Sequence, residues 1–423
     1  MSKQKSLFFV LFEVRESLKN NKKDILFLCQ FFYPEYNSSA SLPYDTAKYL
    51  ANNGFSVGAL CGYPKEYNAY GEVPKKETVD NIEIKRLKYI QLNRKKKIGR
   101  FVNYFSFTFS VLLHIFQFRK YKSVIVYSNP PILPIAAILA NIFFGTKIVF
   151  VSFDVYPEVA YASDSLSEKG FISKFMRFLN HNLFKRVSQV VALTEEMKEF
   201  LLENRPELNP NMLTIIPNWA HEDKARKTKE AFSDFGFSEN DFIVSYFGNM
   251  GVCQDVETLY MAMSTLKNEK RIKFLVVGHG SKLPYMRDAT KDLKNVQVYD
   301  FQIGEKFEHA LAVSSCGIVT LEKGLKGTCA PSKYYSYLQS GLPVIAVVEP
   351  DSYLVKDISE NNIGYSVSVG DGENLVEIIL NMSKNNDSLH MMSDNAENLY
   401  EEKYSINIGT EKYRQMFKRI FYL

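Results

Sequence analysis

The chain has 423 residues, a length typical of two domains, and its 46% hydrophobic and 23% charged content is that of a globular protein with ample core. A net charge of +5 is too small to indicate nucleic acid as the main partner. The five scattered cysteines lack Cys-x-x-Cys spacing, which predicts reduced thiols and no zinc site.

The first residues, 1–23, form a separate N-terminal extension ahead of a domain that starts near Asp24. The apolar block Leu7–Phe12 is short for a signal peptide, and acidic and basic residues follow it instead of a cleavage site. No apolar run approaches the roughly 20 residues of a membrane span. We therefore predict an extra helix here and no transmembrane segment.

The first half of the chain alternates strands and helices. A buried strand over 24–30, a helix from 41 or 42 to 52, and a strand over 55–60 open a Rossmann-like unit. Further strands are predicted over 82–87, 123–127, 147–153, 189–193 and 213–217. Helices are predicted over 133–144 and 173–184 and after Thr194, which precedes two glutamates as a helix cap does.

The second half repeats this order after a polar boundary at 218–238. Strands are predicted over 242–247, 273–277, 296–299, 316–321 and 344–348, and a helix over 256–266. A basic and aromatic helix over 408–421 ends the chain. The pattern predicts two doubly wound parallel sheets, in domains 24–217 and 218–405, with 406–423 as a final helix.

The segment 317–348 carries the strongest sign of a binding site. After the strand, a loop with Gly324, Gly327 and Pro331 leads to Ser332, placed to cap a short helix, and to Lys333 in its first turn. A helix start at the carboxyl edge of a parallel sheet attracts anions, so a lysine there indicates a negative ligand. The alternative is a surface lysine on an ordinary crossover helix.

Several motifs occur in order at the predicted strand ends. They are Phe32-Tyr-Pro-Glu35, Asp154-Val-Tyr-Pro-Glu158, Pro217-Asn-Trp219, Tyr246-Phe-Gly-Asn-Met-Gly251 with Gln254-Asp255, Val276-Val-Gly-His-Gly280, and Pro331-Ser-Lys-Tyr-Tyr335 with Gly341-Leu-Pro-Val344. Together they resemble a GT-B glycosyltransferase of family 4, most of all bacterial O-antigen and capsule transferases related to fucosamine transferase. The resemblance spans about residues 24–420.

The resemblance implies two Rossmann-like domains facing across a cleft, with the final helix crossing back to the first. It also implies retaining transfer from a nucleotide-diphosphate sugar, taken to be UDP, without a cofactor or metal. The sequence has no Asp-x-Asp motif for a diphosphate-bound cation. Lys333, as the one obvious cation of these motifs, and Asp154, on the acceptor side, are the predicted catalytic residues.

The resemblance also implies a set of ligand-binding residues. The donor is expected to contact Gly248, Asn249, Gly251, Gln254, Asp255, Gly278, His279, Glu322 and Ser332, and the acceptor Glu158 and Ser39. Ordinary structural roles remain open for several of them: tight turns for the glycines and His279, and helix caps for Asp154 and for the serines of the first loop. The family's Glu-x7-Glu pair is replaced by Thr328 and Ser336, and its Arg and Lys by Asn249 and Gln254-Asp255.

The segment 93–122 suits a membrane surface. A basic cluster from Arg94 leads into an apolar, aromatic helix that ends in Arg119 and Lys120. Basic residues beside apolar surface dock on anionic headgroups, whereas the alternative is a buried crossover helix. We expect a peripheral enzyme on the cytoplasmic face of the cell membrane, acting on a lipid-linked saccharide in surface polysaccharide synthesis. The alternatives are a UDP-sugar epimerase of the same architecture and a catalytically silent GT-B partner subunit.

Overall fold

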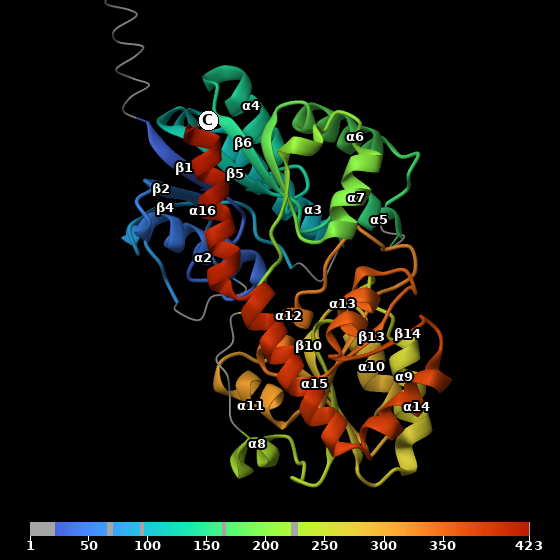
Figure 1. Ribbon diagram of the computed structural model, residues 1–423. Coiled ribbons are helices and arrows are strands. Elements are labelled where there is room, and N and C mark those ends of the chain that lie inside the picture. The colour runs from blue at the N-terminus through green and yellow to red at the C-terminus, as the bar shows by residue number, and fades with distance from the viewer. Residues whose placement is uncertain (1–21, 66–70, 94–96, 163–165, 221–226, 423) are drawn as a thin grey trace, which may run out of the picture.

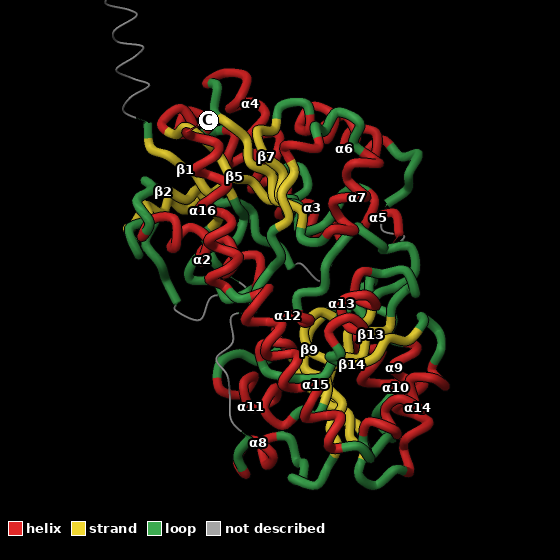
Figure 2. The backbone as a smooth tube through the Cα atoms, viewed as in Figure 1, coloured by secondary structure: helices red, strands yellow, loops and turns green. Residues whose placement is uncertain are grey.

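The computed structural model describes residues 22–65, 71–93, 97–162, 166–220 and 227–422. Two separate sheets, each flanked by helices, make up the molecule (Figures 1 and 2). The predicted N-terminal extension and Arg94, Lys95 and Lys96 of the basic cluster lie outside the described residues.

The first sheet has eight strands in the order β3-β4-β2-β1-β5-β6-β7-β8. All neighbours are parallel except the edge strand β3, which pairs antiparallel with β4. The strands are β1 Lys23–Leu28, β2 Val57–Gly62, β3 Lys76–Val79, β4 Ile82–Leu87, β5 Tyr121–Tyr127, β6 Lys147–Val151, β7 Val187–Ala192 and β8 Leu213–Ile215.

Helices and short helical turns cover the first sheet. They are α2 Ser38–Asn52, α3 Lys97–Leu112, the 3-10 helix η1 Ile115–Lys120, α4 Pro134–Phe144, α5 Glu158–Ala162, α6 Phe171–Phe184, α7 Glu195–Asn204 and η2 Pro210–Met212. Gly145 ends α4 with a φ of 66°, and the Thr194 side chain accepts a hydrogen bond from the Met197 N–H at the start of α7.

The second sheet has six parallel strands in the order β11-β10-β9-β12-β13-β14. The strands are β9 Phe242–Asn249, β10 Ile272–His279, β11 Val296–Asp300, β12 Cys316–Thr320, β13 Val344–Val347 and β14 Gly364–Val367. Every residue of β12 and β13 is buried, as expected of strands covered on both faces.

The helices of this half are α8 Lys229–Asp234, α9 Glu257–Thr265, η3 Leu266–Asn268, α10 Leu283–Ala289, α11 Glu305–Val313, α12 Lys333–Gln339, α13 Tyr353–Asn361, α14 Gly372–Met382 and α15 Asn386–Leu399. A π-helical turn, η4 Tyr400–Tyr404, joins α15 to the last helix, α16 Ile406–Tyr422.

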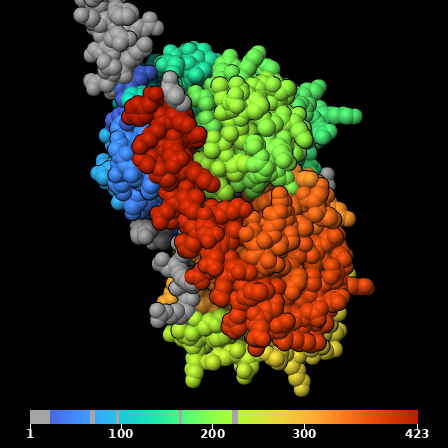
Figure 3. Space-filling view, in the orientation of Figure 1, coloured from blue at the N-terminus to red at the C-terminus, as the bar shows by residue number. Residues whose placement is uncertain are grey.

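The last helix returns to the first sheet. Tyr413, Met416 and Phe417 of α16 are buried in the same core as residues of β1 and β2, and the Tyr49 hydroxyl on α2 donates to Glu411 at 2.9 Å. The C-terminal segment therefore runs over both halves of the molecule (Figure 3).

The strand order sets where a ligand can bind. In open parallel sheets, binding sites form at the carboxyl ends of strands where the order reverses direction. The order of the second sheet reverses between β9 and β12, and that of the first between β1 and β5. Both points lie next to the predicted motifs.

Candidate active site

The carboxyl ends of β9 and β10 form the floor of the predicted donor side. Gly248 and Gly278 are cross-strand partners there, and a Cβ on Gly278 would lie 2.0 Å from the carbonyl oxygen of Gly248. Gly248 itself has a φ of +89°, a conformation that disfavours any side chain. The two glycines therefore let the strands end close together, with Gly278 buried and Gly248 partly exposed at this edge.

Lys333 points at this same edge. Its ammonium lies 3.5 Å from the centroid of the Tyr246 ring and 3.5 Å from the carbonyl oxygen of Asn249. Burial lowers the pKa of Lys333 well below its usual value. No carboxylate among the described residues forms an ion pair with it, so an anion at this edge would supply the missing counter-charge.

The other predicted donor residues divide into two groups. His279 lies near Lys333 and packs edge-on against Phe301 at 5.2 Å, and its pKa is lowered by burial and by the charge of Lys333. Gln254 shapes the loop, since its side chain accepts a hydrogen bond from the Gly251 N–H at 2.8 Å. Asp255, in contrast, is buried, and both of its carboxylate oxygens accept hydrogen bonds from Thr258, so it serves to start α9.

The expected cap at Ser332 is wrong. Ser332 precedes α12 with helical backbone angles, and its side chain makes no capping hydrogen bond. Helix α12 therefore starts without a side-chain cap, and the exposed Ser332 hydroxyl remains at the donor side.

A second lysine that the sequence motifs missed lies at the donor side. The Lys282 ammonium forms an ion pair with Glu322 at 2.6 Å and donates to the Gln254 carbonyl at 2.7 Å. Little in the sequence pointed to Lys282. It follows β10, whereas its partners Gln254 and Glu322 follow β9 and β12. Lys333 is thus not the one cation of this edge, and Glu322 is already paired.

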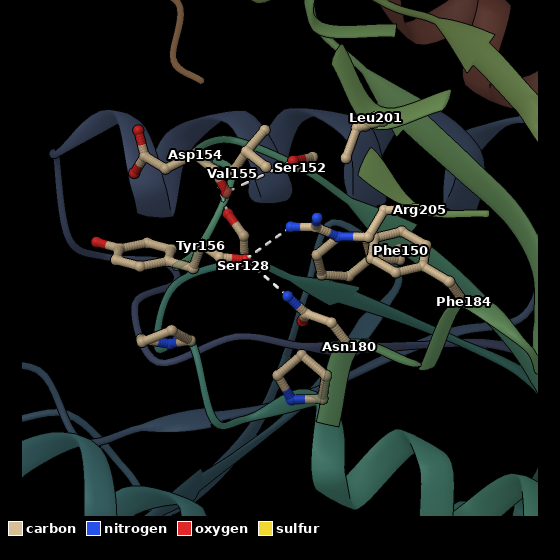
Figure 4. Close-up of a pocket in the computed structure, with 12 residues that line it drawn as sticks. Ser128, Phe150, Ser152, Asp154, Val155, Tyr156, Asn180, Phe184, Leu201 and Arg205 are labelled. Atoms are coloured by element: carbon tan, nitrogen blue, oxygen red, sulfur yellow. Dashed lines mark hydrogen bonds between the residues drawn. The ribbon is translucent and has the colours of Figure 1, made fainter. Parts of the chain in front are cut away.

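On the acceptor side, Asp154 follows β6, in a loop that Ser128 holds by accepting hydrogen bonds from the Phe153 and Asp154 N–H groups, each at 3.0 Å. The Asp154 carboxylate receives no hydrogen bond from any residue that the structure describes, and burial raises its pKa to about 6. Figure 4 shows this carboxylate turned away from the residues that brace the loop behind it.

The bracing involves Glu158. Arg205 binds the Glu158 carboxylate at 2.7 Å. Arg205 and Asn180 also donate to the Tyr156 carbonyl, at 3.2 and 2.7 Å (Figure 4). The cavity between these residues, about 10 Å³, holds at most one water. Glu158 is therefore tied into the support of the loop, while Ser39 lies half-buried inside the first turn of α2.

The two sides meet at the loop before α12. The Val155 N–H donates to the Thr328 carbonyl at 2.7 Å, and Asp154 and Cys329 form an isolated β-bridge. Glu196 on α7 accepts from the Gly327 and Tyr353 N–H groups at 3.0 and 3.1 Å. These contacts hold the Asp154 loop against Cys329, in the loop that leads to Lys333 and α12.

The remaining residues give no sign of a metal centre. Within residues 22–422, apart from the undescribed gaps, no three or more His, Cys, Asp or Glu side chains are grouped to hold a metal ion. None of the helices in that part of the chain is long and apolar enough to cross a membrane.

Known proteins with similar sequence carry glycosyltransferase names. No protein-family model matches the chain. The probable glycosyltransferase WbjE of Pseudomonas aeruginosa is 25% identical over 314 residues, which cover 73% of this chain and 77% of WbjE.

Solved structures share the whole architecture at low identity. Sucrose-phosphate synthase of Thermosynechococcus elongatus has a TM-score of 0.73 at 12% identity, over 95% of this chain and 99% of that one. WaaG, a glycosyltransferase involved in lipopolysaccharide biosynthesis, has a TM-score of 0.68 at 13% identity, over 93% and 99%. HepE of Anabaena, in complex with UDP-glucose, has a TM-score of 0.68 at 14% identity, over 94% and 100%.

The fold and these comparisons define the class of protein. The structure has the GT-B architecture of two parallel-sheet domains, and the expected resemblance to GT-B glycosyltransferases is confirmed. The named relatives also confirm the expectation of an enzyme of the glycosyltransferase class.

Proposed function

We propose that this chain transfers a sugar from UDP to a lipid-linked saccharide, with retention of anomeric configuration, in the synthesis of a bacterial surface polysaccharide. The observation that carries the proposal is the Lys333 ammonium beside the glycine-lined edge of β9 and β10, at the end of a loop whose Cys329 bridges to Asp154. UDP is chosen as the nucleotide because HepE, a structural neighbour, was solved with UDP-glucose. Surface polysaccharide is chosen because WaaG is named for lipopolysaccharide biosynthesis.

In this proposal the donor side stabilises the leaving group. The diphosphate lies against the backbone of Gly248 and Asn249, and Lys333 neutralises the charge that develops as the glycosidic bond breaks. The backbone at this strand edge and a half-buried ammonium attract a diphosphate more strongly than the same groups would in water. This role requires no metal ion at the diphosphate.

The acceptor side activates the incoming hydroxyl. Asp154, ionised above its pKa of about 6, accepts a hydrogen bond from the acceptor hydroxyl and orients it toward the sugar. It then takes the hydroxyl proton as the new glycosidic bond forms and the bond from the sugar to the diphosphate breaks. The contacts from Val155 and Glu196 to the loop before α12 keep bulk water from the reacting atoms.

A lipid-linked acceptor is supported by an exposed apolar stripe on α3 and η1. Its members recur every three or four residues, and between 42% and 76% of each side chain is exposed: Ile98, Phe101, Phe105, Phe109, Leu113 and Phe116. Exposed Arg100 lies on the same helix, and Arg119 and Lys120 end η1. An apolar stripe flanked by cations is typical of helices that lie in the headgroup region on the cytoplasmic face of a membrane.

An apolar pocket connects this stripe to the acceptor side. Phe101, Phe105, Phe171 and Phe175 line about 290 Å³ between α3 and α6. Pro131 belongs both to this pocket and to the cavity behind Asp154. Hydrocarbon of a lipid carrier would thus lie near the residue that receives the acceptor hydroxyl. The stripe favours a transferase over an epimerase, which needs no lipid.

The test is nucleotide release from a panel of UDP- and GDP-sugars, with lipid-linked acceptor, by wild type, Lys333→Ala and Asp154→Asn. We expect release from a UDP-sugar that depends on acceptor and falls in both variants. Full activity in both variants would remove the site assignment. Interconversion of the sugar without acceptor would show an epimerase, and inactivity with every donor despite UDP binding would indicate the silent partner.

Docking of the stripe on a membrane is tested by sedimentation of the protein with lipid vesicles. We expect wild type to bind vesicles with anionic lipid and to bind neutral ones weakly, because each cation near such a surface contributes about 1 kcal/mol. The double change Phe105→Ser and Phe109→Ser should abolish binding. The matched control is Phe178→Ser, since Phe178 is 66% exposed but lies on α6 outside the stripe. Equal binding by all forms would exclude the stripe as the docking surface.

A further inference from the structure

The residues that follow Lys333 contact both places where the chain passes between the two sheets. The first crossing leads from β8 through Asn218. The second is the π-helical turn Tyr400–Tyr404 between α15 and α16. Tyr334 and Tyr335, the second and third residues of α12, are at most 1% exposed and lie between these crossings.

Tyr335 holds the first crossing. Burial raises the pKa of the Tyr335 hydroxyl, and the nearby backbone of Asn218, which is itself 8% exposed, acts to lower it. Its ring packs edge-on against that of Tyr404 with centroids 5.2 Å apart. Tyr335 therefore joins α12 to both crossings at once.

Tyr334 holds the second crossing through Asp357 on α13. The Tyr334 hydroxyl donates to Asp357 Oδ2 at 2.7 Å, and the Tyr404 hydroxyl donates to the same oxygen at 2.5 Å. The Lys403 ammonium binds Asp357 Oδ1 at 2.6 Å. A buried carboxylate with this many donors is costly to leave partly unpaired, so the network keeps one geometry.

These contacts matter because any rotation of one domain against the other would have to bend the two crossings. Hinges in two-domain proteins are a few residues at element ends, and π-helical turns are frequent at functional sites. The Lys333 ammonium lies 3.5 Å from the centroid of the Tyr246 ring, and a diphosphate bound beside it would compete with the ring for this charge. Any resulting shift of α12 reaches both crossings through the next two residues.

We propose that Tyr334, Tyr335 and Asp357 are positioning residues that couple occupancy of the donor edge by a nucleoside diphosphate to the hinge between the domains. The inference rests on the proposed function for the identity of the ligand. The contacts on which the inference rests are made by residues other than the predicted donor-binding and acceptor-binding residues.

The chain has its own reporter of this coupling. It contains one tryptophan, Trp219, which follows Asn218. The indole N–H donates to Asp45 at 3.0 Å, and the ring packs edge-on against Tyr413 of α16 at 6.4 Å. A Cβ on Gly409 would lie 2.4 Å from the Trp219 ring. Trp219 thus touches the first crossing, the first domain and the returning helix.

The experiment titrates UDP and records Trp219 emission, with calorimetry measuring UDP affinity separately. The variants are Tyr335→Phe, Tyr334→Phe and Asp357→Asn. The matched control is Tyr337→Phe on the same helix, because its hydroxyl binds the Phe247 N–H and the Ile318 carbonyl and touches neither crossing.

We expect wild type and Tyr337→Phe to show a saturable emission change with the midpoint that calorimetry finds. Tyr335→Phe and Asp357→Asn should bind UDP within about threefold of wild type yet lose at least about half of the emission change, because each removes a buried polar group beside a crossing. With sugar donor and acceptor, kcat should fall about tenfold while KM changes little. A purely structural role would not separate binding from these signals.

Two outcomes would overturn the coupling: wild-type amplitude in Tyr335→Phe and Asp357→Asn, or an equal loss in Tyr337→Phe. If wild type does not bind UDP, the proposed donor is wrong, and ligand-free quenching of Trp219 by acrylamide then decides the coupling. The coupling predicts about twofold stronger quenching in Tyr335→Phe and Asp357→Asn than in wild type and Tyr337→Phe, from a loosened crossing. Equal quenching in all four would reject it.

Discussion

The two sheets are both open and largely parallel, but they carry different chemistry at the carboxyl ends of their strands. In the second sheet, the edge is made of glycine backbone, and a lysine from the following helix points back at it. In the first sheet, a half-buried carboxylate stands on a loop held by Ser128, Asn180 and Arg205. The edge of the second sheet therefore suits a large anion that lies against the backbone. The edge of the first sheet suits one small polar group held by the Asp154 carboxylate.

The largest expected effect comes from Asp154. Asp154→Asn keeps the shape but removes the carboxylate, so kcat should fall by about 10²–10⁴-fold, the usual contribution of a general base. In wild type, kcat/KM should rise as pH increases through about 6, where Asp154 loses its proton. Asp292→Asn, at an exposed carboxylate, is the control. A variant with near wild-type kcat would place the acceptor chemistry elsewhere.

Lys333→Ala should have the next largest effect. Loss of a charge-assisted contact to the diphosphate should raise the Kd for UDP by about 10–100-fold, measured by calorimetry. Lys356→Ala, at an exposed lysine of α13, should leave the Kd unchanged. If both variants bind UDP equally, the anion does not sit at the glycine-lined edge. Lys282 would then be the first alternative cation to test.

Gly248→Ala should weaken UDP binding by about tenfold, because a side chain at positive φ costs roughly 1–3 kcal/mol and narrows the space beside Lys333. Gly236→Ala provides a matched control, since Gly236 has a φ of +69° and a Cβ added there would have no other atom within 4 Å. It should lose similar stability in thermal unfolding while keeping the Kd. Equal loss of UDP affinity in both would attribute the effect to general instability.

The smallest expected effect is on stability. Burial raises the pKa of Asp154 from 3.8 to about 6. The contribution of Asp154 to the free energy of unfolding is therefore complete below about pH 4 and is lost as the pH rises through 6. Asp154→Asn should therefore stabilise the protein at pH 8, by about 1–3 kcal/mol, and have little effect at pH 4. Denaturant titrations at the two pH values measure this. Destabilisation at pH 8 would mean that the carboxylate has a partner it needs for folding.

Much of the fold could be predicted from the sequence because it is written in local patterns. Buried parallel strands are continuous apolar runs, and turns such as Gly145 and the Thr194 cap end or start helices within a few residues. The edge strand β3 was missed because its four residues, Lys76–Val79, have only weak alternation and are partly exposed. Helix α2 begins at Ser38, earlier than predicted, so the first-loop serines lie in its first turn.

The candidate site was less predictable. Residue types at strand ends indicated Lys333, Gly248 and Asp154, since the carboxyl ends of parallel strands gather at one edge. The same pattern could not separate residues that face the site from those that hold it: Asp255 starts a helix and Glu158 braces a loop. It also could not find Lys282, whose partners lie on other strand ends.

The sequence by itself determined the class of fold, the glycines at the ends of β9 and β10 and the apolar character of α3, because backbone conformation and hydrophobic periodicity depend on neighbours along the chain. Only the tertiary structure decided which carboxylates remain unpaired and which are tied up, and that Tyr334 and Tyr335 reach both crossings. Those properties depend on partners far apart in the chain, as with Glu196 and Tyr353 at a separation of 157 residues and Trp219 and Asp45 at 174. Such pairings arise only when the two sheets and the returning helix have packed together.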